Sequence, residues 1–275
     1  MFKHLLCFAL LGVMLLSCSK YNSVKVTKTN FEDEVLRTQN LVFTFNKTLI
    51  FDSGLMNKWD TTQYIRFEPA IQGRFMWTGK SELTFSPETA LLPATAYKAL
   101  LNNKLLKYSA TKFNVDDEPV LFHTPFLKIN TINTYWSLSE ELASQVEVRC
   151  QLMLNNPVSP SKLKPLLKVL VGGTATDYRI VTQNDAETIE IAFPYNSQDP
   201  GSEAKGEIII EKGLICSGGN TATTGQVQGD FVVPSKERLT IQGFEPGFDQ
   251  GKGYIDIYTS QPLLGEGLGA FVSTD

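Results

Sequence analysis

The chain of 275 residues contains two histidines and four cysteines, the side chains that most often bind metals or act as nucleophiles. One histidine and two cysteines fall within the first eighteen residues, so only His123, Cys150 and Cys216 remain for the rest of the chain. A single histidine cannot build a histidine-rich metal site, and the absence of a Cys-x-x-Cys pair excludes zinc ribbons and thioredoxin-type redox motifs. The phosphate-binding loops G-x-x-x-x-G-K-[ST] and G-x-G-x-x-G are absent as well. The sequence therefore predicts no metal and no cofactor.

His123 is the remaining candidate for a general base. A hydrolase would need a nucleophilic serine on a strained turn beside that base, and the sequence has no G-x-S-x-G. His123 instead precedes Thr124-Pro125, and a proline cannot donate a hydrogen bond into a sheet, so strand pairing should end there. We therefore predict a histidine at a domain boundary, no catalytic residue and no enzyme.

Cys150 and Cys216 leave two interpretations open. They could pair, closing a loop of about 65 residues and stabilising the fold by about 2–4 kcal/mol. They could also be two free thiols, with Cys150 as a small buried apolar residue and Cys216 in a glycine-rich loop.

Aromatic side chains could form a platform that stacks against sugars. The candidates are Trp59, Trp77, Trp136, Tyr64 and Tyr135. Trp77 alternates with Phe75, however, so we expect it to point into a core.

The N-terminus reads as a secretion signal with a lipid attachment site. Lys3 precedes an apolar run of about twelve residues, which is too short to cross a bilayer of about 30 Å as a helix and fits a signal peptide over residues 1–17. The run ends Leu15-Leu16-Ser17-Cys18, which resembles a bacterial lipobox, where cleavage precedes the cysteine that carries the lipid. We therefore expect lipidation at Cys18, a polar tether over residues 18–37, and a lipid-anchored protein of the cell envelope that faces the periplasm.

The charge balance argues against polyanionic partners. With 25 basic and 29 acidic residues, the formal net charge is −4. The net charge gives no electrostatic case for binding nucleic acid or an anionic membrane surface.

The elements that would position these residues are strands. Residues 42–45, 146–154 and 254–258 alternate between apolar and polar side chains, which is typical of half-buried strands, and the second of these places Cys150 on the inner face. Short strands separated by turn residues about every ten positions indicate antiparallel sandwiches. The sequence predicts an all-β fold of tandem immunoglobulin-like domains.

The chain also repeats itself. Segments beginning at Leu41, Cys150 and Ile255 share an apolar strand, a small polar residue and then Pro or Leu, and a period near 100 residues fits one such domain per repeat. In this alignment Asn46, Asn156 and Ser260 occupy equivalent points. We expect domains over residues 38–125 and 126–235, and the start of a third, truncated domain over residues 236–275.

Roughly residues 35 to 275 resemble the N-terminal region of bacterial alpha-2-macroglobulins of the lipoprotein type, most specifically in the first of these domains. The similarity lies in Phe43-x-Phe45, Trp59-Asp60, Ile65-x-Phe67-x-Pro69, Gly73-x-Phe75-x-Trp77, Leu83-x-Phe85-Ser86-Pro87 and Leu92-Pro93-x-Thr95-x-Tyr97. In such modules a tyrosine like Tyr97 often bonds nearby backbone as a tyrosine corner.

The resemblance implies a large endopeptidase inhibitor that traps a protease after a bait segment is cut, in many members with a Cys-x-Glu-Gln thioester. This sequence contains no Cys-x-Glu-Gln, so it would be the non-catalytic, membrane-proximal arm. The implied partners are target proteases through a downstream region, the membrane through Cys18, and a peptidoglycan-synthesis enzyme. The alternative is a tandem immunoglobulin-like surface lipoprotein that binds glycans or a protein.

Overall fold

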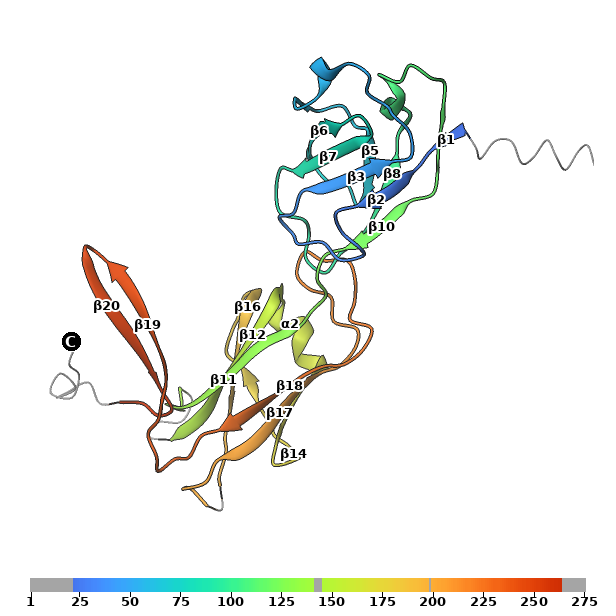
Figure 1. The fold of residues 1–275 in the computed structure, drawn as a ribbon. Coiled ribbons are helices and arrows are strands. Elements are labelled where there is room, and N and C mark those ends of the chain that lie inside the picture. The colour runs from blue at the N-terminus through green and yellow to red at the C-terminus, as the bar shows by residue number, and fades with distance from the viewer. Residues whose placement is uncertain (1–21, 141–144, 198, 264–275) are drawn as a thin grey trace, which may run out of the picture. The chain divides into compact units, whose positions relative to one another are not determined.

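The computed structural model describes residues 22–140, 145–197 and 199–263. This part of the chain is nearly all β-strand and forms two units, Met1–Pro125 and Phe126–Asp275, which confirms the all-β class (Figure 1). The division after Pro125 coincides with the predicted domain boundary. The expected signal peptide and Cys18 lie outside the described residues. In the described ranges, no helix has the length and apolar character needed to cross a membrane.

The first unit is a sandwich of two sheets with a small third one. The five-stranded sheet has the order β2-β3-β7-β6-β4, the three-stranded sheet has the order β10-β8-β5, and β1 pairs with β9 in parallel. The strands are β1 (Ser23–Val24), β2 (Val26–Thr29), β3 (Leu41–Phe45), β4 (Trp59–Asp60), β5 (Ile65–Glu68), β6 (Gly73–Gly79), β7 (Glu82–Pro87), β8 (Ala96–Leu101), β9 (Asn114–Val115) and β10 (Val120–His123), with short 3₁₀ turns η2 (Ser53–Leu55) and η3 (Asn103–Leu106).

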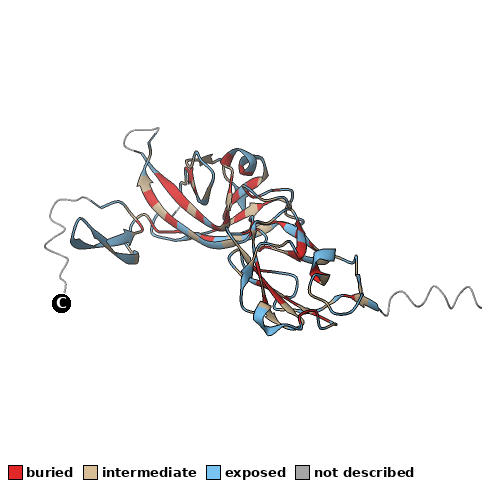
Figure 2. Cartoon of the chain, turned by 90° about the horizontal axis from the view of Figure 1, so that it is seen from above, coloured by how far each residue is buried: buried red, intermediate tan, exposed pale blue. Residues whose placement is uncertain are grey.

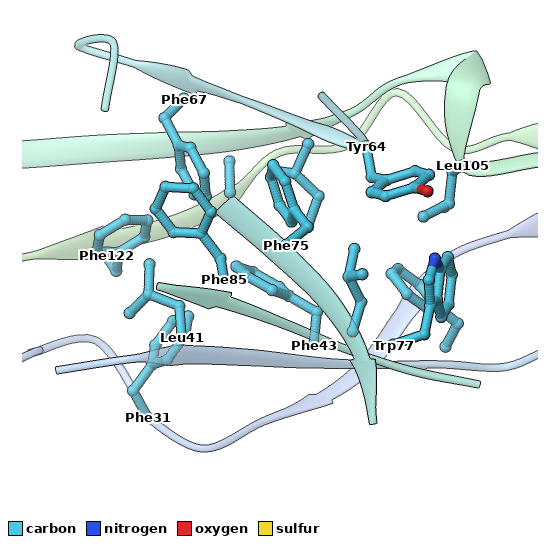
Figure 3. Close-up of a cluster of buried hydrophobic side chains, with 14 of the residues drawn as sticks. Phe31, Leu41, Phe43, Tyr64, Phe67, Phe75, Trp77, Phe85, Leu105 and Phe122 are labelled. Atoms are coloured by element: carbon cyan, nitrogen blue, oxygen red, sulfur yellow. The ribbon is translucent and has the colours of Figure 1, made fainter. Parts of the chain in front are cut away.

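Aromatic rings from both sheets fill the core of this unit (Figure 3). Phe67 of β5 lies 4.6 Å, centroid to centroid, from Phe85 of β7, and Phe75 of β6 lies 4.7 Å from the same ring. Trp77 is buried beside them, which confirms that it points inward. These rings carry the motifs of the alpha-2-macroglobulin resemblance, so those motifs are first of all a core.

The predicted tether is wrong for residues 22–37. Val24 and Val35 are buried, β1 and β2 lie within this stretch, and β2 pairs with β3. The stretch is polar overall because each short strand contributes only one or two inward side chains. A linker and such a strand therefore look alike in composition.

The second unit is another two-sheet sandwich. Its sheets have the orders β11-β12-β16-β15 and β14-β13-β17-β18, and every pairing in them is antiparallel. The elements are β11 (Ile129–Leu138), β12 (Val146–Val158), α2 (Pro160–Leu163), η4 (Lys164–Leu166), β13 (Leu167–Val171), β14 (Thr174–Ala175), β15 (Arg179–Ile180), β16 (Ala186–Phe193), β17 (Ala204–Ile210) and β18 (Val227–Val233).

A two-stranded hairpin follows the second sandwich. It consists of β19 (Ile241–Asp249) and β20 (Lys252–Thr259), which pair with each other and with no other strand of the described chain. Figure 2 shows this hairpin as exposed along almost its whole length, in contrast to the buried stripes on the strands of the sandwiches.

Candidate functional site

His123 stands where the sequence placed it, at the end of β10 and half-buried. Its imidazole Nδ1 lies 3.0 Å from the carbonyl oxygen of Thr124. Its backbone N–H donates to Asp33 O at 2.7 Å, and its carbonyl accepts from Val35 N at 2.9 Å. These contacts are those of a strand end that ties down the chain before the domain boundary.

Both cysteines are buried free thiols, so the structure does not join them in a disulfide. Burial raises the pKa of the Cys150 thiol to about 12 and that of the Cys216 thiol to about 11. A thiol with so high a pKa carries almost no thiolate at neutral pH, and the thiolate is the nucleophilic form. Neither side chain is set up for covalent chemistry.

The aromatic candidates do not form one exposed platform. Trp77, Trp136 and Tyr64 are buried in their units, and Trp136 Nε1 donates to Pro234 O at 2.7 Å. Trp59 is partly exposed, with the Arg74 guanidinium 4.6 Å from its ring centroid. Within the described ranges, no group of three or more His, Cys, Asp or Glu residues could hold a metal ion.

A buried charge cluster on β12 was missed by the sequence analysis. The alternation along this strand places Arg149 and Glu147 on the solvent side, yet both are buried. Arg149 bonds Glu147 at 3.0 Å, Glu190 of β16 at 2.8 Å and Glu140 at 3.0 Å, and Arg179 of β15 bonds Glu147 at 2.6 Å. The signal available in the sequence was the pairing of opposite charges on strands that become neighbours, which needs the register to be read.

The cluster holds structure and offers no reactive group. Burial works against the charge of Arg149, but its bonds to Glu140 and Glu190 raise its pKa above the ordinary value. A guanidinium that stays charged cannot act as a base. The bond to Glu140 ties the segment after β11 to the face of the sheet.

A groove lies between the β11–β12 surface and the β19–β20 hairpin. It has a volume of about 660 Å³, and its lining includes Tyr135, Tyr258, Gln151, Gln242 and Glu245. Aromatic rings with amide donors and acceptors can contact a sugar through ring stacking and hydrogen bonds. This is the described region that best fits the alternative of glycan binding.

A second recurrent arrangement is a clamp formed by one polar side chain. The Asn46 Oδ1 accepts from Lys25 N at 3.0 Å, and its Nδ2 donates to Ser23 O at 3.0 Å. The backbone N–H of Asn46 also donates to Lys25 O at 3.1 Å. We call this arrangement the strand clamp, because a residue at or near the end of one strand fixes two alternate residues that precede its partner strand.

The strand clamp recurs in the second unit. Asn155 Oδ1 accepts from Lys128 N at 2.7 Å, and its Nδ2 donates to Phe126 O at 2.8 Å. The backbone N–H of Asn155 donates to Lys128 O at 3.2 Å. The equivalent of Asn46 is therefore Asn155, and the position assigned from the sequence, Asn156, is one residue too far.

The hairpin carries a third copy of the strand clamp, with serine in place of asparagine. Ser260 Oγ accepts from Thr240 N at 2.8 Å and donates to Arg238 O at 3.4 Å, and Ser260 N donates to Thr240 O at 2.9 Å. A shift in strand register follows each clamp, between Val26 and Lys28, between Ile129 and Thr131, and between Ile241 and Gly243. The hairpin is thus built like the first two strands of each sandwich.

The hairpin nevertheless lacks what covers those strands. From the strand registers, Phe43, Leu152 and Ile257 are equivalent; the first two are fully buried, whereas Ile257 is 44% exposed. Two residues earlier on the strand, Ile255 is 53% exposed where its counterparts are again fully buried. The face of the hairpin that corresponds to the buried face of those strands has no opposing sheet in the described chain.

The chain is 24% identical over 233 residues to the alpha-2-macroglobulin of Pasteurella multocida (strain Pm70), an alignment that covers 80% of this chain. The similarity supports a relationship to the alpha-2-macroglobulin family. The chain spans only 12% of the length of that relative. No family model matches the chain.

Proposed function

We propose that this chain is the N-terminal, non-catalytic arm of a membrane-anchored alpha-2-macroglobulin-like endopeptidase inhibitor. The observation that carries the proposal is the strand clamp, which occurs in two sandwiches and again in the uncovered hairpin. Such an array of like modules fits a chain that aligns with about an eighth of a much longer alpha-2-macroglobulin.

In this proposal the arm positions the rest of the inhibitor on the membrane, and segments further along the protein capture the protease. Buried thiols of raised pKa support this division, as does the lack of a Cys-x-Glu-Gln sequence. In this proposal, target proteases meet the bait segment of the downstream region. A peptidoglycan-synthesis enzyme remains a proposed partner that comes from the family resemblance alone.

The anchor is the lipidated Cys18, which places the arm in the cell envelope, facing the periplasm. Metabolic labelling with a palmitate analogue tests this point in the native host. Label should enter the wild-type protein and the matched variant Cys7→Ala, and it should be lost from Cys18→Ala. Equal labelling of the two variants would contradict lipid attachment at Cys18.

The inhibitor role is tested with the full-length gene product and an endopeptidase assayed on two substrates. A trap that encloses its protease should block cleavage of a large protein while a small chromogenic peptide is still cut. The chain of residues 19–275 alone should block neither. Inhibition of the small peptide by residues 19–275 would contradict the role of a passive arm, and a gene that stops after codon 275 would contradict the whole proposal.

The groove gives the alternative, a glycan-binding lipoprotein, one specific observation in its favour. Isothermal titration of residues 19–275 with soluble peptidoglycan fragments tests it. Binding that is lost in Tyr258→Ala and kept in Tyr254→Ala, a change on the same strand outside the groove, would favour this alternative.

A further inference from the structure

One end of the first unit gathers four loops that are far apart in sequence. β3, β6 and β8 end there, and β5 and β7 begin there, so residues 46–58, 61–63, 80–81 and 102–113 share this end (Figure 1). Hydrogen bonds confirm the grouping: Leu49 N donates to Lys80 O at 2.8 Å, and Asn102 N donates to Tyr64 O at 2.9 Å. Asn22, at the start of the described chain, belongs to the same end because its Nδ2 donates to Lys112 O at 3.0 Å.

These loops are strongly basic. They contain one acidic residue, Asp52, and six lysines: Lys47, Lys58, Lys80, Lys104, Lys107 and Lys112. All of these lysines except the half-buried Lys47 are exposed. The loops at the opposite end, residues 30–40, 69–72 and 88–95, contain four acidic residues and one arginine. We call the first group of loops the basic end.

Nearby acids offset part of this charge. Asp60 accepts hydrogen bonds from Tyr64 Oη and Thr62 N, at 2.5 and 2.6 Å, and its charge interacts with that of Lys107, so it offsets one of the six lysines. Residues 116–118 follow β9, where Asp116 N donates to Val24 O at 2.9 Å, and the chain then continues to β10. The net charge of −4 for the whole chain conceals this separation.

The proposed lipid attachment site is close in sequence to the basic end. Cys18 precedes Asn22 by four residues, and four residues span at most about 14 Å. If Cys18 is at a bilayer surface, the lysines near Asn22 are held close to it. Charges act on one another mainly within a Debye length of about 8 Å at physiological salt, so the local charge matters more than the net charge of the chain.

We propose that the basic end of the first unit docks on an anionic phospholipid surface beside the lipid anchor. This inference rests on the proposed attachment at Cys18 and adds a second, electrostatic contact to it. A lipid anchor alone would not set the orientation of the first unit on the membrane. Lysines that contact phospholipid headgroups would set its orientation on the membrane.

Vesicle flotation with the unlipidated chain of residues 19–275, which holds both folded units, tests the contact without the anchor. Vesicles of phosphatidylcholine with 40% phosphatidylglycerol should bind the chain at low salt, and pure phosphatidylcholine vesicles should not. Each lysine near an anionic surface contributes about a fivefold factor in binding, so Lys104→Gln, Lys107→Gln and Lys112→Gln together should weaken binding by about 100-fold.

The matched control removes three exposed lysines from the second unit, as Lys162→Gln, Lys164→Gln and Lys205→Gln, and should bind like the wild type. Circular dichroism melting checks that both triple variants stay folded. Equal loss in the two variants, equal binding to neutral vesicles, or no binding of the wild type at low salt would overturn the proposal. The assay uses neither a lipidated cysteine nor a protease, so its failure is distinct from failure of the proposed inhibitor role.

Discussion

At the scale of single residues, the cluster around Arg149 should dominate the stability of the second unit. Arg149→Met leaves Glu190 without its ion-pair partner and Glu147 with Arg179 alone, which should lower the free energy of unfolding by about 3 kcal/mol. Urea unfolding followed by tryptophan fluorescence measures this loss. Lys168→Met breaks an exposed ion pair with Glu211 and should leave stability nearly unchanged; a similar loss in both variants would contradict the account.

The two thiols should resist alkylation in the native protein. Because burial raises their pKa values to about 12 and about 11, iodoacetamide at pH 8 should react with Cys150 and Cys216 far more slowly in the folded chain than in urea. The stabilisation that comes from burying these thiols in their neutral form is fully present below the unfolded pKa of about 9. It is lost as pH rises from there toward the pKa values of the folded protein. Mass spectrometry of labelled peptides would show fast native labelling if the buried placement were wrong.

Tyr97 should make a measurable backbone contact. It is buried, and its Oη accepts from Leu92 N at 2.9 Å, as a tyrosine corner requires. Tyr97→Phe keeps the ring and removes the acceptor, so the first unit should lose about 1 kcal/mol. Denaturant unfolding measures this, with Tyr254→Phe on the exposed hairpin as the unaffected control; no loss in Tyr97→Phe would contradict the corner.

Residues whose neighbours are close in sequence were the predictable ones. Tyr97 reaches Leu92, five residues away, and Trp77 shares its strand with Phe75, so short patterns were enough. Arg149 and Glu147 were not predictable in this way, because Glu190 and Arg179 come from other strands and decide whether that face is wet or buried. An alternation pattern indicates which side of the sheet a residue faces, but it does not indicate what covers that side.

At the scale of elements, the strand clamp should fix the start of each sandwich. Asn155→Ala removes two side-chain hydrogen bonds to Lys128 and Phe126, and we expect a loss of about 1–2 kcal/mol. Hydrogen exchange should accelerate at the Lys128 amide first, because that donor loses its side-chain acceptor. Asn184→Ala, at an exposed position of the same unit, should change neither quantity. Unchanged exchange at Lys128 would show that the clamp is incidental.

The repeat itself was visible in the sequence, but its registration and the role of its polar residue were not. Each clamp is a contact between a side chain and the backbone, so Lys25, Lys128 and Thr240 need share no side-chain type. The first strands of the repeats therefore look unrelated, which is also why residues 22–37 were assigned to a tether. Only the residue that supplies the clamp is recognisable in the sequence, and it can be asparagine or serine.

At the scale of the whole molecule, equivalent substitutions in a covered and an uncovered repeat should have opposite outcomes. Leu152→Glu places a charge in a closed core and should cost more than about 4 kcal/mol, which unfolds the second unit. Ile257→Glu occupies the equivalent position of the hairpin and should leave the unfolding midpoint unchanged while reducing the binding of a hydrophobic dye. Urea titration and dye fluorescence on residues 19–275 measure both.

The same Ile257→Glu change in the full-length gene product provides the complementary measurement. If downstream strands cover the hairpin, the substitution there should destabilise the third module as strongly as Leu152→Glu destabilises the second. A full-length protein that tolerates Ile257→Glu would show that the hairpin face stays open, contrary to the proposed array of modules.

The parallel pairing of β1 with β9 gives the first unit a mechanical property. The chain enters at the basic end through Ser23 and leaves through His123 at the opposite end, so tension between the proposed anchor and proposed downstream modules would pull along the strands. The bonds of β1 with β9 and of the Asn46 clamp then bear the load together in shear, and they cannot be peeled apart one at a time. In the proposed inhibitor, a pull between the membrane and the downstream modules would pass through the first module along its strands.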